Sequence, residues 1–229
     1  MSAAPSDASS AHAFRLAGLF AGRAQPLGPR GELSGIIKQR VHGRVWIQRL
    51  GLEGDEQADA RVHGGLDKAV HQYAAEHYPT LLRAFPEQAT LFVPGSMGEN
   101  LSTHGLTEAT FCIGDVFRVG EARLQVSQPR SPCWKIDARF GQVGVMRFVF
   151  EQAITGWYYR VLTPGRVATG DAFELIDRNM EAVTLAALWS ATHTATTSVD
   201  DLVRLEATPG LSENWARKLA RKRSEPAGR

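Results

Sequence analysis

The sequence VSQPRSPCWK, at residues 126–135, places a cysteine in a proline-rich segment that follows a strand-like run. Pro129 and Pro132 fix the backbone φ angle and lack an N–H group, so the residues around them belong neither to a helix nor to the centre of a sheet. The segment therefore predicts a stiff surface loop directly after a β-strand. Loops of this kind, held by a rigid scaffold, often carry functional residues.

Cys133 is the first candidate for chemistry in this loop. Arg130 and Lys135 put positive charge near its sulfur and favour the thiolate form. A thiolate is a soft metal ligand and also a nucleophile or sulfur carrier. Most lone cysteines are small buried hydrophobic residues, and this is our interpretation of Cys112, which lies on a predicted strand without basic neighbours. For Cys133 the flanking prolines and cations favour a functional role.

The rest of the chain is β-rich first and helical last. Branched and aromatic residues form strand-like runs at 14–20, 34–40, 44–50, 111–119 and 123–128, the last two suggesting a hairpin. Residues 51–65 are acidic, polar and rich in glycine, which predicts an exposed loop. The expected architecture is a mostly antiparallel β-barrel.

Two helices are predicted within this region. Asp67 is a suitable N-cap for a helix over 68–85, and residues 148–162 are long enough for a second. Three short helices are expected at the C-terminus, at 184–190, 199–207 and 213–223. Ser198 and Ser212 precede the last two as N-caps.

The domain organisation follows from this change in character. We expect a disordered leader at 1–13, a barrel domain at 14–178 and a three-helix domain at 179–229. The length of 229 residues agrees with one domain and a smaller appendage.

The composition excludes several classes of protein. Hydrophobic residues make up 43% and charged residues 22%, so disorder over most of the chain is excluded. A net charge of +2 does not support a general role on nucleic acid or on a membrane surface. The two cysteines are too few for a disulfide framework, and the start of the chain lacks the basic region of a secretory signal, so we expect a cytoplasmic protein.

The sequence RVHGGLDK at residues 61–68 is the second candidate site. Gly64 and Gly65 before a helix let backbone amides approach an anion, and the start of a helix favours negative charge. Arg61, His63 and Lys68 would complete a phosphate site. The spacing of a P-loop is missing, and an ordinary turn into a helix explains the glycines equally well.

Two further groups of polar residues are weaker candidates. His63, Asp67 and His71 are spaced four apart, but the intervening glycines separate His63 from the predicted helix and no cysteine or carboxylate cluster completes a metal site. Glu99 and Asn100 lie in a glycine-flanked loop and suit ligand recognition; side chains that stabilise their own turn explain them equally well.

The last predicted helix carries five basic residues between positions 217 and 223. The residues before it resemble a helix-hairpin-helix, a motif that binds the DNA backbone, although Ser212 stands where that motif has its second glycine. A solvated helix face is the simpler interpretation.

Taken together, several stretches resemble the MOSC family, named for its kinship with the C-terminal part of molybdenum-cofactor sulfurases, and most of all its YiiM-type branch. The matching stretches are GLEGDEQ at 51–57, VHGG at 62–65, EHY at 76–78, FPEQ at 85–88, GENLS at 98–102, GD at 114–115 and VSQPRSPC at 126–133. The last is long and specific.

The resemblance implies a fold and a site. It implies a mainly β protein, a MOSC-type β-barrel with flanking helices, that binds the molybdenum cofactor with Cys133 as the metal ligand and the residue of catalysis. The residues to which it gives the cofactor are Arg61, His63, Gly64, Gly65, Lys68, Glu99, Asn100, Arg130 and Ser131.

The activity implied is the reduction of N-hydroxylated substrates such as N-hydroxylaminopurine. Electrons must then come from a separate reductase, because the two cysteines cannot hold an iron–sulfur cluster. The 229 residues also leave no room for the pyridoxal-phosphate domain of the sulfurase relatives, so we expect no such cofactor. Two alternatives stay open: a carrier of sulfur or of the cofactor that uses Cys133, and a nucleic-acid-binding module that uses the basic tail. The sequence does not rank His63, His71 and Asp137 as proton donors.

Overall fold

The computed structural model describes residues 14–59 and 63–225, and the predicted leader and Arg61 lie outside them. The strands are β1 (Phe14–Ala21), β2 (Gln25–Leu27), β3 (Glu32–Ser34), β4 (Gln39–Arg40), β5 (Val45–Gln48), β6 (Gly51–Leu52), β7 (Val70–Ala74), β8 (Leu101–Thr103), β9 (Val116–Val119), β10 (Ala122–Pro129), β11 (Trp157–Thr163), β12 (Gly165–Val167) and β13 (Ala172–Asp177). The helices are η1 (Leu66–Lys68), η2 (Ala75–His77), α2 (Tyr78–Ala84), η3 (Pro86–Leu91), α3 (Lys135–Phe140), α4 (Val145–Glu151), α5 (Leu185–His193), α6 (Val199–Glu206) and α7 (Glu213–Ser224).

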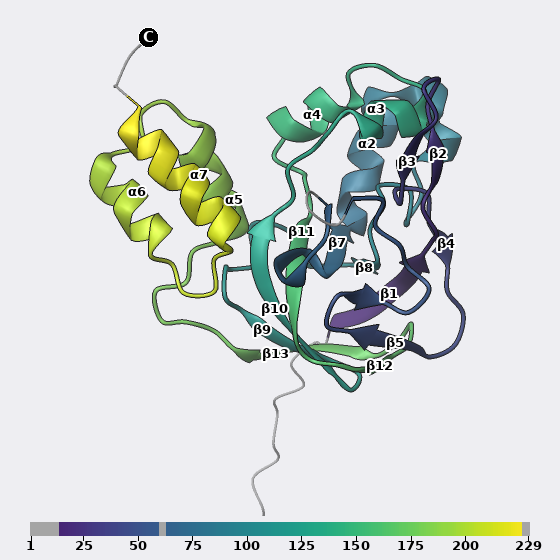
Figure 1. Cartoon of the computed structure of the whole chain (residues 1–229), viewed down its shortest axis with the longest axis horizontal. Coiled ribbons are helices and arrows are strands. Elements are labelled where there is room, and N and C mark those ends of the chain that lie inside the picture. The colour runs from purple at the N-terminus through teal and green to yellow at the C-terminus, as the bar shows by residue number, and fades with distance from the viewer. Residues whose placement is uncertain (1–13, 60–62, 226–229) are drawn as a thin grey trace, which may run out of the picture.

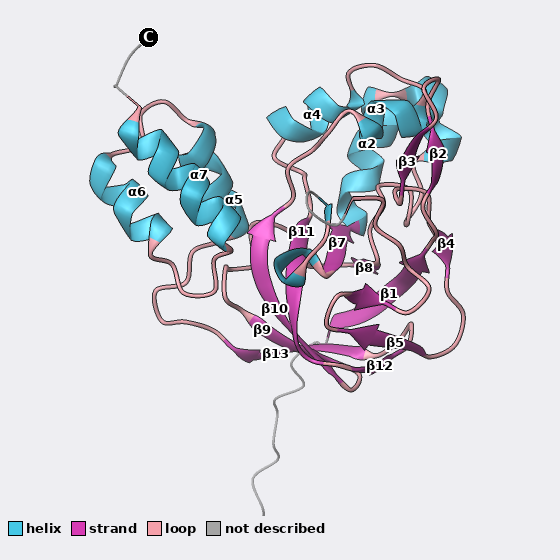
Figure 2. Cartoon of the chain, viewed as in Figure 1, coloured by secondary structure: helices cyan, strands magenta, loops and turns pink. Residues whose placement is uncertain are grey.

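Seven strands form a closed barrel in the order β13-β9-β10-β11-β7-β8-β1, because β1 also pairs with β13. The pair β7–β8 is parallel and the other pairs of the ring are antiparallel. Closure removes the sheet edges that would otherwise invite pairing with another chain. The predicted mainly β barrel with flanking helices is confirmed (Figure 2).

The predicted helix over 68–85 is wrong. The structure has one turn of 3-10 helix at η1, then the strand β7, and an α-helix only from Tyr78. All five residues of β7 are buried, because it pairs with β11 on one side and with β8 on the other. A strand without polar alternation cannot be distinguished from a buried helix by periodicity. Pro79 stands in the first turn of α2, where a proline is tolerated.

The predicted helix over 148–162 is also wrong. Helix α4 ends at Glu151, and the strand β11 begins at Trp157. Ala153 and Gly156 between them have positive φ angles of 55° and 73°, which a helix cannot contain. The run WYYRVLT then supplies the aromatic and branched residues typical of a strand.

Two smaller corrections concern the N-terminal half. The expected strand over 34–40 is interrupted, because β3 ends at Ser34 and β4 begins at Gln39. The segment 51–65 is not simply an exposed loop, because it starts with β6 and the Asp55 side chain is only 2% exposed.

The three C-terminal helices agree with the prediction to within a few residues, and Ser198 and Ser212 cap α6 and α7. Their buried side chains, including Leu188, Trp215 and Leu219, belong to the same hydrophobic cluster as the barrel interior. Figure 1 shows these helices beside β10. The helical part is therefore packed onto the barrel through a continuous apolar core.

A second hydrophobic cluster lies under the helices α2, α3 and α4 and the hairpin β2–β3, which gather at one end of the barrel (Figure 1). Its members include Ile36 and Met97, which also line a pocket. The pocket thus opens where this cluster meets the barrel strands.

The first testable prediction concerns an ion pair where the barrel meets the C-terminal helices. Arg178 donates from Nε and Nη2 to the two carboxylate oxygens of Asp115, at 2.8 and 2.6 Å, and the Asp115 side chain is fully buried. Arg178→Met should lower the free energy of unfolding by about 2 kcal/mol, because it leaves a buried carboxylate without its cation. Urea denaturation measures this.

The matched control is Arg118→Met, since Arg118 pairs with Glu174 on the neighbouring strand, where both side chains are exposed. An exposed pair contributes about 0–1 kcal/mol, so this variant should stay within 0.5 kcal/mol or so of the parent. Equal losses in the two variants would contradict the assigned role of Asp115.

Candidate functional site

One pocket joins residues from widely separated parts of the chain, most of them in loops. Its free volume, including the part open to solvent, is about 650 Å³. The residues that line it are Ser34, Gly35, Ile36, Lys38, Asp55, Glu56, Gln57, Ala58, His63, Lys68, His71, Met97, Gly98, Asn100, Arg130, Ser131, Cys133, Lys135 and Tyr158. Cys133 and five of the residues predicted to hold the cofactor are among them: His63, Lys68, Asn100, Arg130 and Ser131.

Cys133 reaches the pocket from the loop that follows β10. Pro129 is the last residue of β10 and pairs with Trp157, a strand-end position that proline tolerates. The Cys133 carbonyl accepts the amide of Ile136 at 3.0 Å, at the start of α3, so the sulfur stands between a strand end and a helix start. The thiol is free and partly exposed. Cys112, in contrast, is buried at the protein core, as its sequence context indicated.

Four cationic side chains surround the pocket: Lys38, Lys68, Arg130 and Lys135. Their effect is visible at His63, whose pKa is lowered by burial and then by the charges of Lys135, Arg130 and Lys68. Clustered cations repel one another, and an anionic ligand relieves that repulsion. The arrangement is therefore suited to bind an anion.

Two buried polar atoms in the pocket make no hydrogen bond within the part of the chain that the structure describes. These are Nη1 of Arg130 and Nε2 of His71. Burial, and next the charge of Arg130, hold the pKa of His71 well below its usual range, so the ring is neutral at physiological pH. Buried polar groups without partners are rare in folded proteins and suit a ligand that supplies the missing contacts.

Gly156 lets these groups approach one another. A Cβ atom at this position would lie 2.4 Å from the carbonyl oxygen of Gln72 and 2.9 Å from Nε2 of His71, so any side chain would displace the ring. The Gly156 amide donates to Oε1 of Glu108 at 2.7 Å, and its carbonyl accepts the Arg130 amide at 2.9 Å. Through its amide and its carbonyl, Gly156 thus connects the buried Glu108 carboxylate to Arg130 at the start of the cysteine loop.

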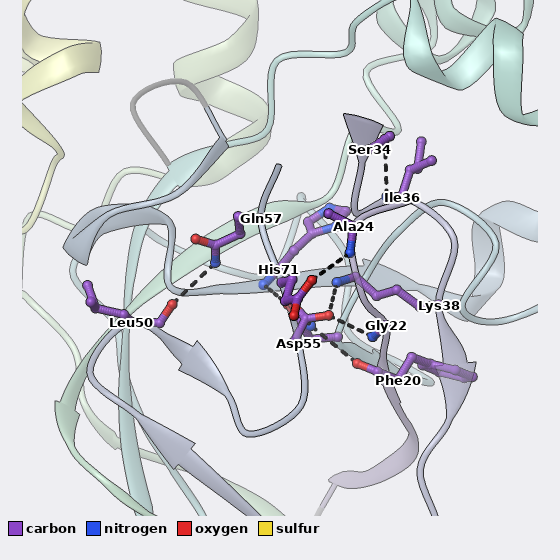
Figure 3. A network of polar contacts seen from close by, with 12 residues as sticks. Phe20, Gly22, Ala24, Ser34, Ile36, Lys38, Leu50, Asp55, Gln57 and His71 are labelled. Atoms are coloured by element: carbon purple, nitrogen blue, oxygen red, sulfur yellow. Dashed lines mark hydrogen bonds and ion pairs between the residues drawn. The ribbon is translucent and has the colours of Figure 1, made fainter. Parts of the chain in front are cut away.

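Asp55 and Asn100 organise the opposite wall of the pocket, and Figure 3 shows Asp55 close to Lys38, Gly22 and His71. Oδ1 of Asp55 accepts the Gly22 amide at 2.9 Å and the Lys38 ammonium, and its Oδ2 accepts Nδ2 of Asn100 at 2.9 Å. Oδ1 of Asn100 in turn accepts the His71 amide at 3.0 Å. One carboxylate and one amide thereby connect five separate segments of chain.

Sequence reasoning did not identify Lys38 and Asp55 as site residues. Their side chains are only 5% and 2% exposed, and they pair across 17 positions of sequence. Burial is the main cause that lowers the pKa of Lys38, and the Asp55 carboxylate offsets part of this shift. The acidic glycine-rich stretch at 51–57 suggested a loop, and nothing in its residue types indicated that the loop folds inward.

Other predicted site residues do not line the pocket. Both oxygens of Glu99 are used within the fold, since Oε1 accepts the Tyr78 hydroxyl and the Gly95 amide at 2.6 Å each and Oε2 accepts the Met97 amide at 3.1 Å. Burial raises the pKa of Glu99, and these hydrogen bonds oppose the shift. Glu99 therefore stabilises its own turn, the alternative that its sequence context left open.

The turn at Gly64 and Gly65 does not have the geometry expected from the sequence, in which backbone amides at a helix start approach an anion. Gly64 and Gly65 are not among the residues that line the pocket, and the helix that follows them is the single turn η1. A helix of three residues has no appreciable dipole, so it provides no anion site at its start. Gly65, at φ 91°, places the turn so that Lys68 lines the pocket.

Asp137 is not placed to act as a proton donor. Its carboxylate accepts the amides of Gly144 and Met146, at 3.1 and 2.7 Å, and so holds the start of α4. Of the three acids considered from the sequence, His63 and His71 line the pocket.

The basic residues of α7 are largely engaged within the helical part. Lys222 donates to the carbonyls of Ala191, Thr192 and Thr194 at the end of α5, and Lys218 lies over the ring of Trp215 at 4.6 Å. Arg217 and Arg223 pair with Glu213 and Glu206. This pattern is that of a stabilising helix face.

Among residues 14–59 and 63–225 there is no group of three or more His, Cys, Asp or Glu side chains that could hold a metal ion. In the same ranges no helix combines the length and the apolar character that crossing a membrane requires.

Comparison with known proteins supports a single family. The family model for the MOSC domain matches residues 59–174. The chain is 44% identical to the protein YiiM of Escherichia coli over 195 residues, 85% of this chain and 87% of that protein. It is 38% identical over 160 residues to a protein of Gibberella moniliformis named reductase, of which the match covers 28%.

Solved structures agree with the sequence matches. The structure of YiiM from E. coli superposes with a TM-score of 0.74 over 87% of this chain and 92% of that one. YiiM from Geobacillus stearothermophilus superposes with a TM-score of 0.77 at 25% identity, over 92% of this chain and 100% of that one. The barrel, the cysteine loop and these similarities agree with one another. The chain belongs to the MOSC domain family.

Proposed function

We propose that this chain is a molybdenum-cofactor-dependent reductase of N-hydroxylated compounds such as N-hydroxylaminopurine. The observation that carries the proposal is the meeting of Cys133 with the buried Nη1 of Arg130, which has no partner among the described residues, in one pocket rich in cations. A soft sulfur ligand beside an anion site matches a ligand that carries both a metal and a phosphate.

The residues of the pocket fit that cofactor. Arg130 and Lys68 supply charged donors for the pterin phosphate, with Lys135 adding positive charge nearby. Cys133 supplies the thiolate that would hold the metal. Ser131, which lies between Arg130 and Cys133 in the sequence, also lines the pocket and offers a hydroxyl as a hydrogen-bonding group.

When bound, the cofactor supplies two electrons and an acceptor for oxygen, which no side chain of this protein provides. The overall reaction is R–NH–OH + 2 e⁻ + 2 H⁺ → R–NH₂ + H₂O. The chain must therefore deliver protons. His63 lines the pocket, where burial and the nearby cations lower its pKa, and we assign its imidazole to pass protons from solvent to the substrate. The neutral, buried ring of His71 is suited to orient a ligand by a hydrogen bond.

The electrons are proposed to come from a separate reductase. The sequence contains two cysteines, one in the core and one in the pocket, so it offers no ligand set for an iron–sulfur centre. The similarity to a segment of a fungal reductase supports the oxidoreductase class.

The alternative is a carrier that binds sulfur or the cofactor through Cys133 without turnover. The same pocket serves it, and a single-turnover experiment separates the two functions. A nucleic-acid-binding function is not favoured, because the cations of α7 are engaged within the helices.

The second prediction tests the sulfur. Cys133→Ala should abolish reduction of N-hydroxylaminopurine and leave thermal unfolding of the apoprotein nearly unchanged, because a methyl group disturbs little packing at a partly exposed loop position. Molybdenum and pterin content, measured beside single-turnover reduction, show whether the cofactor is retained.

Cys112→Ser is the matched control. Its serine hydroxyl replaces a buried sulfur, so it should cost about 1–2 kcal/mol of stability and keep the cofactor. Near-normal turnover in Cys133→Ala would refute the thiolate-ligand mechanism. Cofactor retained in the parent protein with no turnover of any N-hydroxylated substrate would favour the carrier.

The third prediction tests the phosphate site. Lys68→Ala or Arg130→Ala should weaken pterin binding about tenfold or more, because each loses a charge-assisted contact with the phosphate. Arg123→Ala is the control, since Arg123 is exposed on β10 and does not line the pocket. Pterin content after purification from a strain that makes the cofactor measures the effect. Equal retention in all three variants would exclude the proposed phosphate site.

A further inference from the structure

His77 and Glu108 form a buried pair, and neither residue lines the pocket. Nε2 of His77 lies 2.6 Å from Oε2 of Glu108, and the two side chains are only 11% and 7% exposed. His77 ends η2, and Glu108 lies between β8 and β9. The ring of Tyr73 packs edge-on against the imidazole, with the ring centroids 5.2 Å apart. One oxygen of the Glu108 carboxylate is therefore held by a partner that is itself packed in place.

The other oxygen of Glu108 connects this pair to the pocket. Oε1 accepts the Gly156 amide at 2.7 Å, and the Gly156 carbonyl accepts the Arg130 amide at 2.9 Å. Three successive hydrogen bonds thus run from the imidazole of His77 to the main chain of Arg130. Arg130 lines the pocket, and its buried Nη1 has no partner among the described residues.

Gly156 is the residue of this chain of contacts that most needs to be fixed. Its φ angle is 73°, and a glycine backbone has more conformational freedom than that of any other residue. On the side of β7 it is closely packed, since a Cβ atom would lie 2.4 Å from the Gln72 carbonyl oxygen and 2.9 Å from Nε2 of His71. A shift of Gly156 therefore changes its contact with the His71 ring and displaces the amide of Arg130.

The main chain of Glu108 is also held in place. Its carbonyl accepts the amide of Ala186 at 2.9 Å, in the first turn of α5. Close by in sequence, Cys112 forms a β-bridge with Thr184, the N-cap of the same helix. The Glu108 carboxylate thus projects from a backbone that is bonded to the C-terminal helices.

Stability alone does not account for a buried pair of this kind. Apolar residues of similar volume often replace a buried ion pair without loss of stability. They cannot accept the hydrogen bond of the Gly156 amide, and Gly156 is buried, so that amide would be left unpaired. The specific contribution of Glu108 is an acceptor at a defined position.

We propose that Glu108 is a positioning residue for the pocket, supported by His77: its carboxylate fixes Gly156, and Gly156 fixes the main chain of Arg130 so that the guanidinium stays at the phosphate site. The inference rests on the proposed function, which assigns Arg130 to the cofactor phosphate. It also connects the C-terminal helices to the cysteine loop, because Glu108 bonds to α5 through its main chain and to Gly156 through its side chain.

The experiment compares the full-length apoprotein with Glu108→Gln, Glu108→Asp and Glu108→Met. Glutamine lacks the charge but keeps an acceptor for Gly156 and a donor for His77, whereas aspartate keeps the charge but is one methylene shorter. Asp115→Leu is the matched control. Asp115 is also a fully buried carboxylate that accepts a main-chain amide, that of Cys112 at 2.8 Å, and it does not line the pocket.

Two readouts are needed. The first is the Kd of each apoprotein for inorganic phosphate, measured by titration calorimetry. The second is the rate of hydrogen exchange at the Arg130 amide, measured by NMR and divided by the rate at the Leu16 amide. The Leu16 amide donates to the Asp171 carbonyl at 3.0 Å, outside the pocket, so the ratio corrects for a loss of global stability.

Glu108→Met and Glu108→Asp should bind phosphate about fivefold more weakly than the parent, and their exchange ratios should rise about tenfold, because the Gly156 amide loses its acceptor. Glu108→Gln and Asp115→Leu should stay within about twofold of the parent in both readouts. An effect of charge alone has the opposite sign. Loss of a carboxylate near an anion site would tighten phosphate binding in Glu108→Gln and Glu108→Met alike.

Two results would overturn the inference: tighter phosphate binding in both uncharged Glu108 variants, or a parental exchange ratio in a folded Glu108→Met protein. If Glu108→Met does not fold, the comparison of Glu108→Asp with Glu108→Gln decides, because only the aspartate variant should be impaired. A parent protein that binds no phosphate would refute the proposed phosphate site alone. The exchange ratios would still decide the role of Glu108.

Discussion

The close approach of three chain segments at Gly156 is the constraint on which the site depends. Only a residue without a side chain fits between the carbonyl of Gln72 and the ring of His71. The same residue fixes the beginning of the cysteine loop through the Arg130 amide and ties the strand β11 to Glu108. Because β7, β10 and β11 meet there, the sulfur, the guanidinium and the imidazole are brought together by backbone geometry before any ligand binds.

The pocket is electrostatically uneven. Lys38 and Asp55 form a buried pair in one wall, where partners and the Asn100 amide satisfy both charges. The opposite wall keeps Arg130 buried with one nitrogen unpartnered among the described residues. The two walls therefore differ in how far their charges are satisfied within the fold.

Sequence reasoning found the parts of the fold that depend on local signals. The serine N-caps identified α6 and α7, and the proline pair identified the loop of Cys133. It failed at β7, where burial on both faces removes the alternation that marks a strand, and at β11, where Ala153 and Gly156 interrupt what looked like one helix. The pocket residues Lys38 and Asp55 could not be found in this way, because their pairing arises only from tertiary contact. The loop residues and the resemblance to a family both pointed to Cys133, but neither indicated the wall formed by Lys38 and Asp55.

The closure of the barrel by its first and last strands has a consequence for synthesis. The Arg15 side chain donates to the Gly170 carbonyl, 155 residues along the chain, and β1 pairs with β13 in the same region. During translation the strands β1 and β9 each have an unpaired edge until β13 has been synthesised. Contacts between residues so far apart in sequence form slowly. Open strand edges also favour association between nascent chains.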